Sequence, residues 1–516
     1  MKRAVTLAVV FGLGLMASAR PATGDAVPEL AAFDEEVQAL MSRWGLPGAT
    51  LAVAHRGALV LARGYGAADA AGAVPVQPDT LFRLASVSKT VTALAVMKLV
   101  EDGALTLDLA VFPYLARGTP SDLRVNQITV RHLLEHSGGW DSRVAGDPLV
   151  QGASIAQAMR VPAPPSDDTI LRYMLTQPLQ FVPGTQSVES NFGYLVLGKV
   201  VERASGQTLQ AYTRSVLLRA GITRMLPARS FAADRSVAEA SYLTDPGWTV
   251  PSVFATVPGR VPWPDGGMAL ESATATLGWV GSAIDLVALA AALDGEPTRP
   301  DALSAASQTT MSARPSFAPS ASRWWAKGWQ VNSSGTWWQT GAMPGTSALL
   351  VRTGDGTQWA FLSNWRPANA DAFLADLDAT LWRAYGTVGT WPAVDRFPAL
   401  HSNGPLNGCF GDPLFSGGNL CIPAVDVVAG DGTRQRFTAS FVRVTDPGFL
   451  TVQLQAADAA DNASDNVAVY EGGTITLPRV VVTDLSGKPS VYSATLGLVP
   501  GTDPPRFRLT RSAALK

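Results

Sequence analysis

Apolar residues gather in segments whose spacing predicts both strands and helices. Residues 49–66 hold two apolar runs separated by Arg56-Gly57, which predicts two buried strands joined by a tight turn. Residues 86–103 are almost wholly apolar in their second half and end at Gly103, which predicts a buried helix closed by a glycine. The N-terminal part of the chain therefore predicts a core that both element types share.

The same mixture continues to about residue 386. Residues 278–295 and 368–386 each predict a helix, and Gly386 closes the second one. Between these helices, residues 336–353 and 357–365 read as adjacent strands. Strands and helices thus recur over a region that we assign to residues 26–386.

The pattern changes after this region. Segments such as 449–456 and 490–499 alternate apolar and polar residues, with turn residues between them. This alternation predicts a small all-β domain, which we assign to residues 396–516. The chain as a whole is therefore expected to be an α+β protein with a β-rich C-terminal appendage.

Composition supports a folded, multidomain chain. A length of 516 residues suggests two or three units, and 47% hydrophobic against 16% charged residues is a globular balance. The formal net charge is −2 and no basic run is present, so nucleic acid is not an expected partner. The sequence contains no H-E-x-x-H motif and no clustered His/Asp set, so we expect neither a metal nor another cofactor.

The N-terminus has the pattern of an export signal. Lys2 and Arg3 precede an apolar run over residues 4–16, and Ala-Ser-Ala at 17–19 offers a cleavage site. A membrane anchor is the alternative, but the run is shorter than the roughly 20 residues that a spanning helix needs. We therefore expect residues 1–19 to be a signal peptide and the protein to be periplasmic or secreted, with no transmembrane segment after signal removal.

The two cysteines, Cys409 and Cys421, lie close together near the C-terminus. In an exported chain such a pair usually forms a disulfide, although two free thiols are the alternative. We expect the disulfide.

A serine and a lysine mark the start of the predicted buried helix. Ser86 precedes the apolar run, where backbone N–H groups and the positive helix end favour developing negative charge. Lys89 lies three residues later on the same face, and a desolvated lysine can take the proton of a serine. The alternative is a capping serine with a solvated lysine, against which the apolar run argues.

A second polar group lies in residues 182–194, which read as a loop leading into a helix. Glu189 and Asn191 are its chemistry-bearing residues. The amide of Asn191 is suited to hold a substrate amide or to orient Lys89.

A third group lies on the predicted strand that contains Gln339, Thr340 and Gly341. A glycine there lets a substrate approach the backbone closely. The backbone N–H of Ala342 is then placed to join that of Ser86 as an oxyanion hole.

Five segments, taken in order, resemble the serine β-lactamase and penicillin-binding protein superfamily. They are LFRLASVSKTVTALAVMKLVEDGALTLD, ITVRHLLEHSGGWD, FVPGTQSVESNFGYLVLGKVVERASG, GWVGSAIDL and WWQTGAMPGTSALLV. The likeness covers residues 30–385 and is strongest to the class C-like branch, which also holds esterases and D-amino-acid peptidases. It implies a β-lactamase/transpeptidase-like fold, with an antiparallel sheet flanked by helices and a helical subdomain across the active site.

The resemblance also implies a role for individual residues. Ser86 matches the nucleophile, Lys89 its partner, Asn191 the third position of the Y-x-N motif, and Gly341 the glycine of K-T-G or H-x-G. His136 lies in LLEHSGGW, which fits a structural turn, so no Ser–His mechanism is expected.

Two positions depart from the family pattern. Glu189 replaces the tyrosine of Y-x-N, and Gln339 replaces the lysine or histidine of the third motif. A carboxylate beside Lys89 stays ionised and keeps the lysine charged, so it is a weak base and a poor proton donor to a leaving amine. Gln339 lacks the charge that would hold a substrate carboxylate. Both changes favour esters over β-lactams and peptides.

Two functions remain open at this level. The first is an exported serine hydrolase that forms an acyl-enzyme through Ser-x-x-Lys and acts on a small acyl or cell-wall-derived substrate. The second is a catalytically impaired β-lactamase-like protein that binds a cell-envelope ligand.

Overall fold

The structure is a computed structural model that describes residues 21–236, 238–299, 301–397, 414–416, 419–428, 434–443, 449–456, 468–483, 489–499 and 506–514. The segment 1–19 and Cys409 lie outside these residues. The signal peptide and the Cys409–Cys421 disulfide therefore stay predictions.

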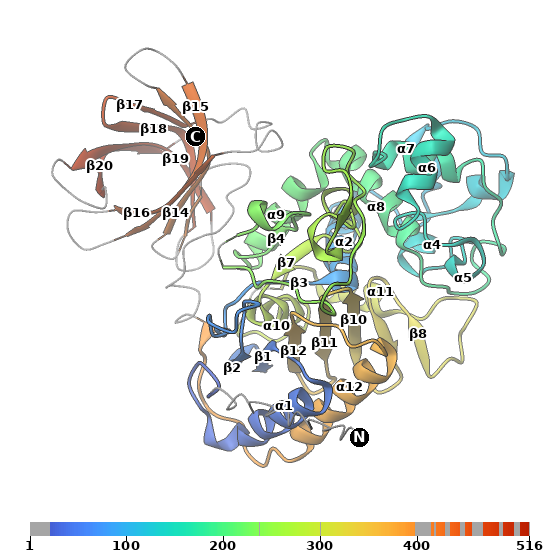
Figure 1. The fold of residues 1–516 in the computed structure, drawn as a ribbon, viewed down its shortest axis with the longest axis horizontal. Helices are drawn as coiled ribbons and strands as arrows, with labels where there is room; N and C mark the ends of the chain where they lie inside the picture. Colours follow the sequence, from blue (N-terminus) through green and yellow to red (C-terminus); the bar gives the residue numbers. More distant parts are fainter. Residues whose placement is uncertain are drawn as a thin grey trace, which may run out of the picture.

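An antiparallel sheet in the order β2-β1-β12-β11-β10-β9-β8 forms the centre of the larger part of the chain (Figure 1). Its seven strands are β1 (Gly48–His55), β2 (Ala58–Gly66), β8 (Arg323–Trp325), β9 (Gln330–Asn332), β10 (Trp337–Met343), β11 (Thr346–Arg352) and β12 (Thr357–Ser363). The first predicted strand pair is confirmed, and positive φ angles at Arg56 (48°) and Gly57 (77°) make its turn. Ala52 of β1 lies opposite Ala360 of β12, so distant parts of the chain meet here.

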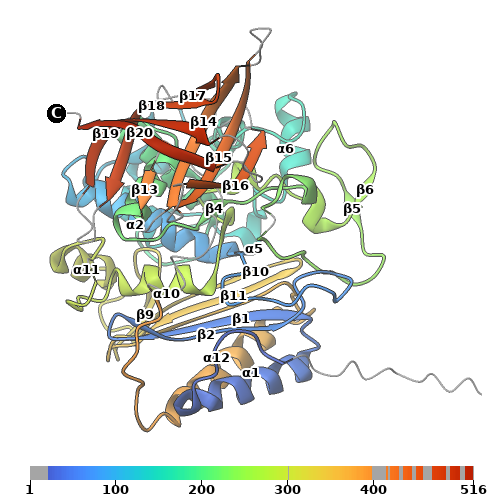
Figure 2. The same ribbon diagram turned by 90° about the vertical axis from the view of Figure 1, so that its left-hand side faces the viewer.

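Helices cover both faces of this sheet. Figure 2 shows α1 (Ala31–Trp44) and α12 (Ala370–Gly386) on one face and α10 (Ala283–Ala291) on the other. Along β1, Leu51 and Val53 pack in the cluster with α1 and α12, while Ala52 and Ala54 belong to the opposite core. Because both faces are covered, the strand is apolar at successive positions instead of alternating.

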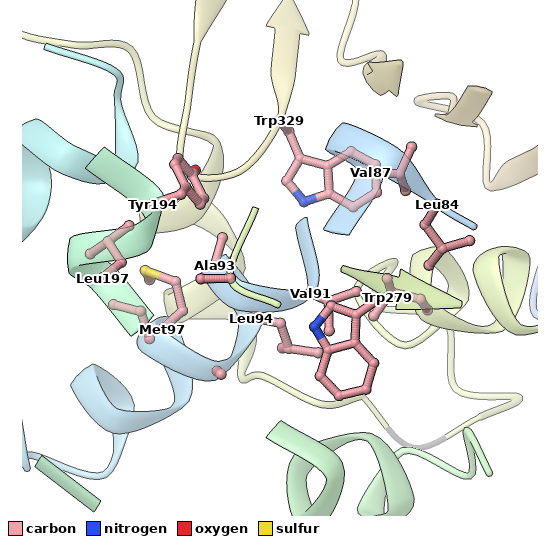
Figure 3. Packing of buried hydrophobic residues seen from close by; sticks show 14 of the residues in the cluster. Leu84, Val87, Val91, Ala93, Leu94, Met97, Tyr194, Leu197, Trp279 and Trp329 are labelled. Atoms are coloured by element: carbon pink, nitrogen blue, oxygen red, sulfur yellow. The ribbon is translucent and has the colours of Figure 1, made fainter. Parts of the chain in front are cut away.

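The helix α2 (Ser88–Glu101) passes through the middle of the molecule. Figure 3 shows Ala93 and Met97 of this helix near Tyr194 and Leu197, and Val91 and Leu94 beside Trp279. The prediction of a buried helix is confirmed, with one difference. The α-helix begins at Ser88, and a 3₁₀ turn, η2 (Ala85–Val87), holds Ser86 in front of it.

The helical subdomain packs around α2 on the side away from the sheet. Its main helix, α8 (Asn191–Ser205), begins after Ser190, whose side chain accepts a hydrogen bond from the N–H of Gly193. The other helices of the described chain are α3 (Val111–Leu115), α4 (Val130–Leu134), α5 (Ser142–Ala145), α6 (Gly152–Met159), α7 (Asp167–Met174), α9 (Leu209–Arg219) and α11 (Ala305–Ser312). Short strands complete this part: β3 (Phe82–Arg83), β4 (Leu226–Pro227), β5 (Val250–Pro251), β6 (Arg260–Val261) and β7 (Trp279–Gly281).

The described residues from 414 onward form β-strands without a helix, which confirms the predicted all-β character. These strands are β13 (Leu414–Ser416), β14 (Asn419–Val428), β15 (Arg434–Arg443), β16 (Phe449–Ala456), β17 (Ala468–Glu471), β18 (Thr474–Thr483), β19 (Pro489–Val499) and β20 (Arg506–Ala514). They form one sheet whose ends meet through the pairs β13–β18 and β14–β17. Ile475, Leu496 and Phe507 lie in its own apolar core. None of the helices that the structure describes combines the length and the apolar character needed to cross a membrane.

The core between the sheet and α12 predicts a strong effect of one substitution. Trp359 is fully buried and packs edge-on against Trp382 at 4.9 Å between ring centroids. We expect Trp359→Ala to lower the free energy of unfolding by about 3–5 kcal/mol, because the indole leaves a cavity that the sheet cannot close. Trp248→Ala, at a side chain that is 40% exposed, is the matched control. Denaturant unfolding checks this, and equal midpoints for the two variants would contradict it.

Candidate active site

Ser86 lies on a backbone turn held in a disfavoured conformation. Ala85, just before it, has φ of +48° although it is not glycine and is fully buried. Such a left-handed residue costs about 1–2 kcal/mol, so the surrounding packing has to hold the turn in place. The turn leaves Ser86 half-buried while its neighbours on both sides are buried.

Lys89 joins the two predicted reactive residues. Its Nζ lies 3.2 Å from Ser86 Oγ and 2.5 Å from Glu189 Oε1. Lys89 is 1% exposed, whereas 46% of the Glu189 side chain remains accessible. The structure therefore brings Ser86, Lys89 and Glu189 together as predicted, with the lysine inside and the carboxylate at the surface of the site.

The charge state of Glu189 follows from this contact. The Lys89 ammonium lowers the pKa of the Glu189 carboxyl, and this attraction outweighs the opposing effect of burial. Glu189 is consequently ionised at neutral pH. In this arrangement Lys89 Nζ donates to both Ser86 Oγ and Glu189 Oε1, so the lysine lies between the hydroxyl and the carboxylate.

Strand β10 touches the Ser86 turn through Gly341. A Cβ atom at Gly341 would lie 2.4 Å from the carbonyl oxygen of Leu84 and 3.0 Å from the nitrogen of Ser86. The glycine was predicted to admit a substrate, but its immediate reason is that the protein's own backbone comes this close. Trp337 and Trp338 of β10 pair with β9 as well as β11, whereas residues 339–343 pair only with β11 among the described strands. The opposite edge of β10 at these residues faces the Ser86 turn.

The side chains of residues 339–342 lie differently from the expectation. Gln339 is buried, and its Nε2 donates to the carbonyl oxygen of Ser86 at 3.3 Å. Through this N–H it ties β10 to the turn that holds Ser86, whereas its Oε1 is buried without a hydrogen-bond partner among the described residues. Thr340 and Ala342 are half-buried and alternate with Gln339 along the strand. The role predicted for Ala342, as an oxyanion-hole donor, concerns its backbone N–H and not its side chain.

Asn191 does not contact Lys89. It is the first residue of α8, and its Nδ2 donates to Asp147 Oδ2 at 2.5 Å. Its Oδ1 is buried without a hydrogen-bond partner among the described residues. The expectation that Asn191 orients the lysine is thus replaced by a contact that fastens α8 to the loop around Asp147.

Sequence reasoning treated His136 as part of a turn only, but it lies against the reactive group. Its Nδ1 accepts a hydrogen bond from the backbone N–H of Ser190 at 3.2 Å, next to Glu189. Burial lowers the pKa of His136 to about 3, so the ring is neutral. The signal in the sequence was a histidine between Glu135 and Ser137 in a glycine-containing turn, which by itself indicates no partner.

An apolar cavity of about 100 Å³ lies between the helical subdomain and residues 253–273. Leu149, Ile170, Trp263, Met268 and Ala273 are among its lining residues. Met268 and Ala273 belong to the same apolar cluster as Ala85 and Met343, but Ser86, Lys89 and Glu189 are not among the residues that line the cavity. Within the described residues, no group of three or more His, Cys, Asp or Glu side chains is arranged to hold a metal ion.

Comparison with known proteins agrees with this geometry. The profile of the family described as Beta-lactamase matches residues 33–381. Esterase EstB from Burkholderia gladioli is 39% identical over 186 residues, which cover 35% of this chain and 46% of the esterase. A putative D-alanyl-D-alanine carboxypeptidase from Escherichia coli O157:H7 is 29% identical over 242 residues, which cover 42% of this chain and 54% of that protein. The chain thus spans about half the length of these relatives.

A solved structure extends the likeness in fold. The octameric penicillin-binding protein homologue from Pyrococcus abyssi superposes with a TM-score of 0.52 at 18% identity, covering 94% of this chain and 100% of that one. The predicted fold class is confirmed.

The close approach at Gly341 predicts the effect of adding one methyl group. We expect Gly341→Ala to reduce the labelling rate of Ser86 by a fluorophosphonate at least about 10-fold, because the Cβ would push the Ser86 turn out of place. Gly386→Ala is the matched control, since a Cβ there meets nothing within 4 Å. Labelling of Gly341→Ala at the unmodified protein's rate, with the fold intact by circular dichroism, would refute this.

Proposed function

The chain belongs to the beta-lactamase family, and from this premise we propose that it is a serine hydrolase that forms an acyl-enzyme at Ser86 and prefers esters. The family holds esterase and carboxypeptidase relatives, which leaves the substrate to be argued from this site. One observation carries the proposal: Lys89 Nζ lies within hydrogen-bonding distance of both Ser86 Oγ and Glu189 Oε1.

The proposed reaction uses these three residues in sequence. Lys89 passes a proton to Glu189 and takes the proton of Ser86, whose Oγ attacks the substrate carbonyl. The N–H groups of Ser86 and Ala342 stabilise the resulting oxyanion. The alcohol or phenol part of the ester departs, and water then releases the acyl group from Ser86 by the same proton path.

The charge state of Glu189 supports the preference for esters. An amine has to be protonated as it leaves, but the lowered pKa of the Glu189 carboxyl makes it hold the proton received through Lys89 only weakly, and 46% of its side chain is accessible to water, so this proton is lost before an amine departs. A phenolate leaves without one. Gln339 adds to this preference, because its amide is neutral and donates to Ser86 O, so it supplies no charge for a substrate carboxylate.

The apolar cavity supports an ester with a hydrophobic acyl or alkyl group. Its lining consists mainly of apolar side chains, and two of them, Met268 and Ala273, belong to the apolar cluster that also contains Ala85. We also propose that the protein acts in the periplasm or outside the cell, on the basis of residues 1–19.

The Lys89–Glu189 contact also supports a second candidate. An ammonium held at 2.5 Å by a carboxylate resists giving up its proton, which would leave Ser86 unreactive. In that case the protein is a binder of a cell-envelope ligand. Covalent labelling separates the two functions.

We expect Ser86→Ala to abolish both fluorophosphonate labelling and the hydrolysis of p-nitrophenyl butyrate, because Ser86 supplies the nucleophile. The matched control is Ser88→Ala, which removes a fully buried hydroxyl that accepts from the N–H of Trp279 at 3.1 Å. Full activity in Ser86→Ala would sink the assignment. An unmodified protein that neither labels nor turns over the ester would favour the binder.

We expect Glu189→Tyr to raise the ratio of kcat/KM for nitrocefin to that for a p-nitrophenyl ester, because a phenol can return a proton to a leaving amine. Glu189→Gln, which removes the charge and supplies no titratable proton, should lower both constants. A ratio that is unchanged or lower in a folded Glu189→Tyr variant would show that Glu189 does not set the substrate range.

A further inference from the structure

We propose that His136 is a positioning residue that holds Glu189 against Lys89 by binding the residues on both sides of Glu189. The N–H of Val188 donates to the carbonyl oxygen of His136 at 2.8 Å, and the N–H of Ser190 donates to His136 Nδ1 at 3.2 Å. Glu189 thus lies in the chain between two residues whose backbone N–H groups are bound by one histidine. The proposal rests on the proposed function, in which Glu189 takes part in proton transfer.

The chemistry of the ring suits it to accept this bond permanently. The His136 side chain is buried, and its centroid lies 4.9 Å from that of Tyr194 and 4.7 Å from that of Trp325, which it meets edge-on. Burial and then the nearby Lys89 ammonium lower the pKa of His136, and Glu189 opposes them less strongly. Nδ1 therefore keeps its lone pair for the N–H of Ser190 at neutral pH.

The backbone at His136 is specialised as well. Its φ of +56° lies in the left-handed region, which most non-glycine residues avoid and asparagine tolerates. The flanking residues bind the same loop: the N–H of Gly184 donates to Ser137 O at 2.8 Å, and Ser187 Oγ donates to Glu135 O at 2.8 Å. The turn 135–137 therefore holds the loop 184–190 at four points.

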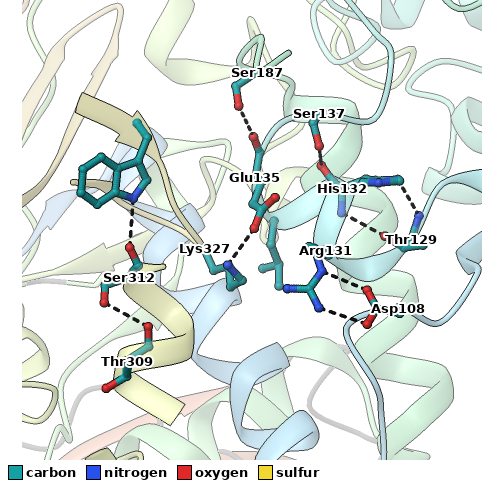
Figure 4. A network of polar contacts seen from close by, with 12 residues as sticks. Asp108, Thr129, Arg131, His132, Glu135, Ser137, Ser187, Thr309, Ser312 and Lys327 are labelled. Carbon is teal, nitrogen blue, oxygen red and sulfur yellow. Dashed lines mark hydrogen bonds and ion pairs between the residues drawn. The ribbon is translucent and has the colours of Figure 1, made fainter. Parts of the chain in front are cut away.

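A buried ion pair also holds the turn 135–137 in place. Lys327 Nζ lies 2.7 Å from Glu135 Oε1, and both side chains are at most 3% exposed (Figure 4). Lys327 lies between β8 and β9, and the carbonyl oxygen of the next residue, Gly328, accepts a hydrogen bond from Thr90 Oγ1 at 2.8 Å. Thr90 follows Lys89 on α2. One loop thus joins the turn that places Glu189 to the helix that carries Lys89.

Two substitutions separate the contribution of the Nδ1 acceptor from that of the positive φ at His136. His136→Gly permits the positive φ but removes Nδ1, whereas His136→Asn permits the same φ and offers an amide oxygen close to the Nδ1 position. With p-nitrophenyl butyrate we expect kcat to fall at least about 10-fold in His136→Gly and to stay within about threefold in His136→Asn, with KM little changed in both. His55→Ala, on β1 and bound to Thr357, is the matched control.

A second readout follows the carboxylate itself. In His136→Gly a loosened Glu189 loses part of the Lys89 attraction, so its pKa rises toward the ordinary value, while His136→Asn keeps it low. Carbon-detected NMR titration of selectively labelled glutamate measures this without turnover. The titration separates failure of the proposed function from failure of the positioning proposal. An inactive protein defeats the proposed function, whereas the Glu189 pKa still tests whether His136 positions Glu189.

Each result of these experiments either supports or overturns the positioning role of His136. Wild-type kcat and an unmoved Glu189 pKa in a folded His136→Gly would overturn the proposal, as would a His136→Asn variant impaired as deeply as His136→Gly. Should His136→Gly not fold, Ser187→Ala removes one of the four loop contacts from a half-buried position. A fall in kcat of about twofold or more in that variant supports the proposal, and an unchanged kcat overturns it.

Discussion

Burying a lysine in the first turn of α2 constrains everything around it. The helix is enclosed on all its faces, from Ser88 through Leu99 with few exceptions, so Lys89 has almost no contact with water. A charged ammonium in such a place has to be paired and hydrogen-bonded. Ser86 and Glu189 supply those partners, which is why a loop from the helical subdomain and a turn from the sheet side converge on one nitrogen atom.

The identity of residue 189, the charged partner of Lys89, shapes the chemistry of the site. A phenol at position 189 would share a proton with Lys89 without carrying charge, whereas the carboxylate completes an ion pair. The pair satisfies the buried lysine well, but an ammonium cannot take the proton of Ser86 until it has passed one of its own protons to Glu189. Stability of the site and reactivity of Ser86 therefore oppose one another here, and the balance between them decides between a hydrolase and a binder.

The surrounding contacts keep this arrangement rigid. Gly341 and Gln339 fix β10 against the Ser86 turn, and Asn191 fixes the start of α8 to Asp147. Each of these residues contacts the protein itself, and their predicted contacts with a substrate stay predictions. Ser86, Lys89 and Glu189 are thus held in position by the protein's own contacts.

The sequence alone determined the fold class, the buried strands and helix, and the residues gathered at the site. It did so because apolar periodicity and turn residues are local signals, and because Ser86, Lys89 and Glu189 lie in recognisable segments. It also foresaw that Glu189 would be ionised beside Lys89. Only the tertiary structure decided where the amides of Gln339 and Asn191 point, since each had several partners within reach of a flexible side chain.

The part of His136 was likewise decided in three dimensions. The proposed role of His136 depends on the backbone N–H of Ser190, which is more than 50 residues away in sequence. It also depends on the buried Lys327–Glu135 pair, whose members are 192 residues apart. No local pattern encodes contacts of this range. They arise when packing brings α4, α8 and the β8–β9 loop together, because burial then forces each polar group to find a partner among whatever lies beside it.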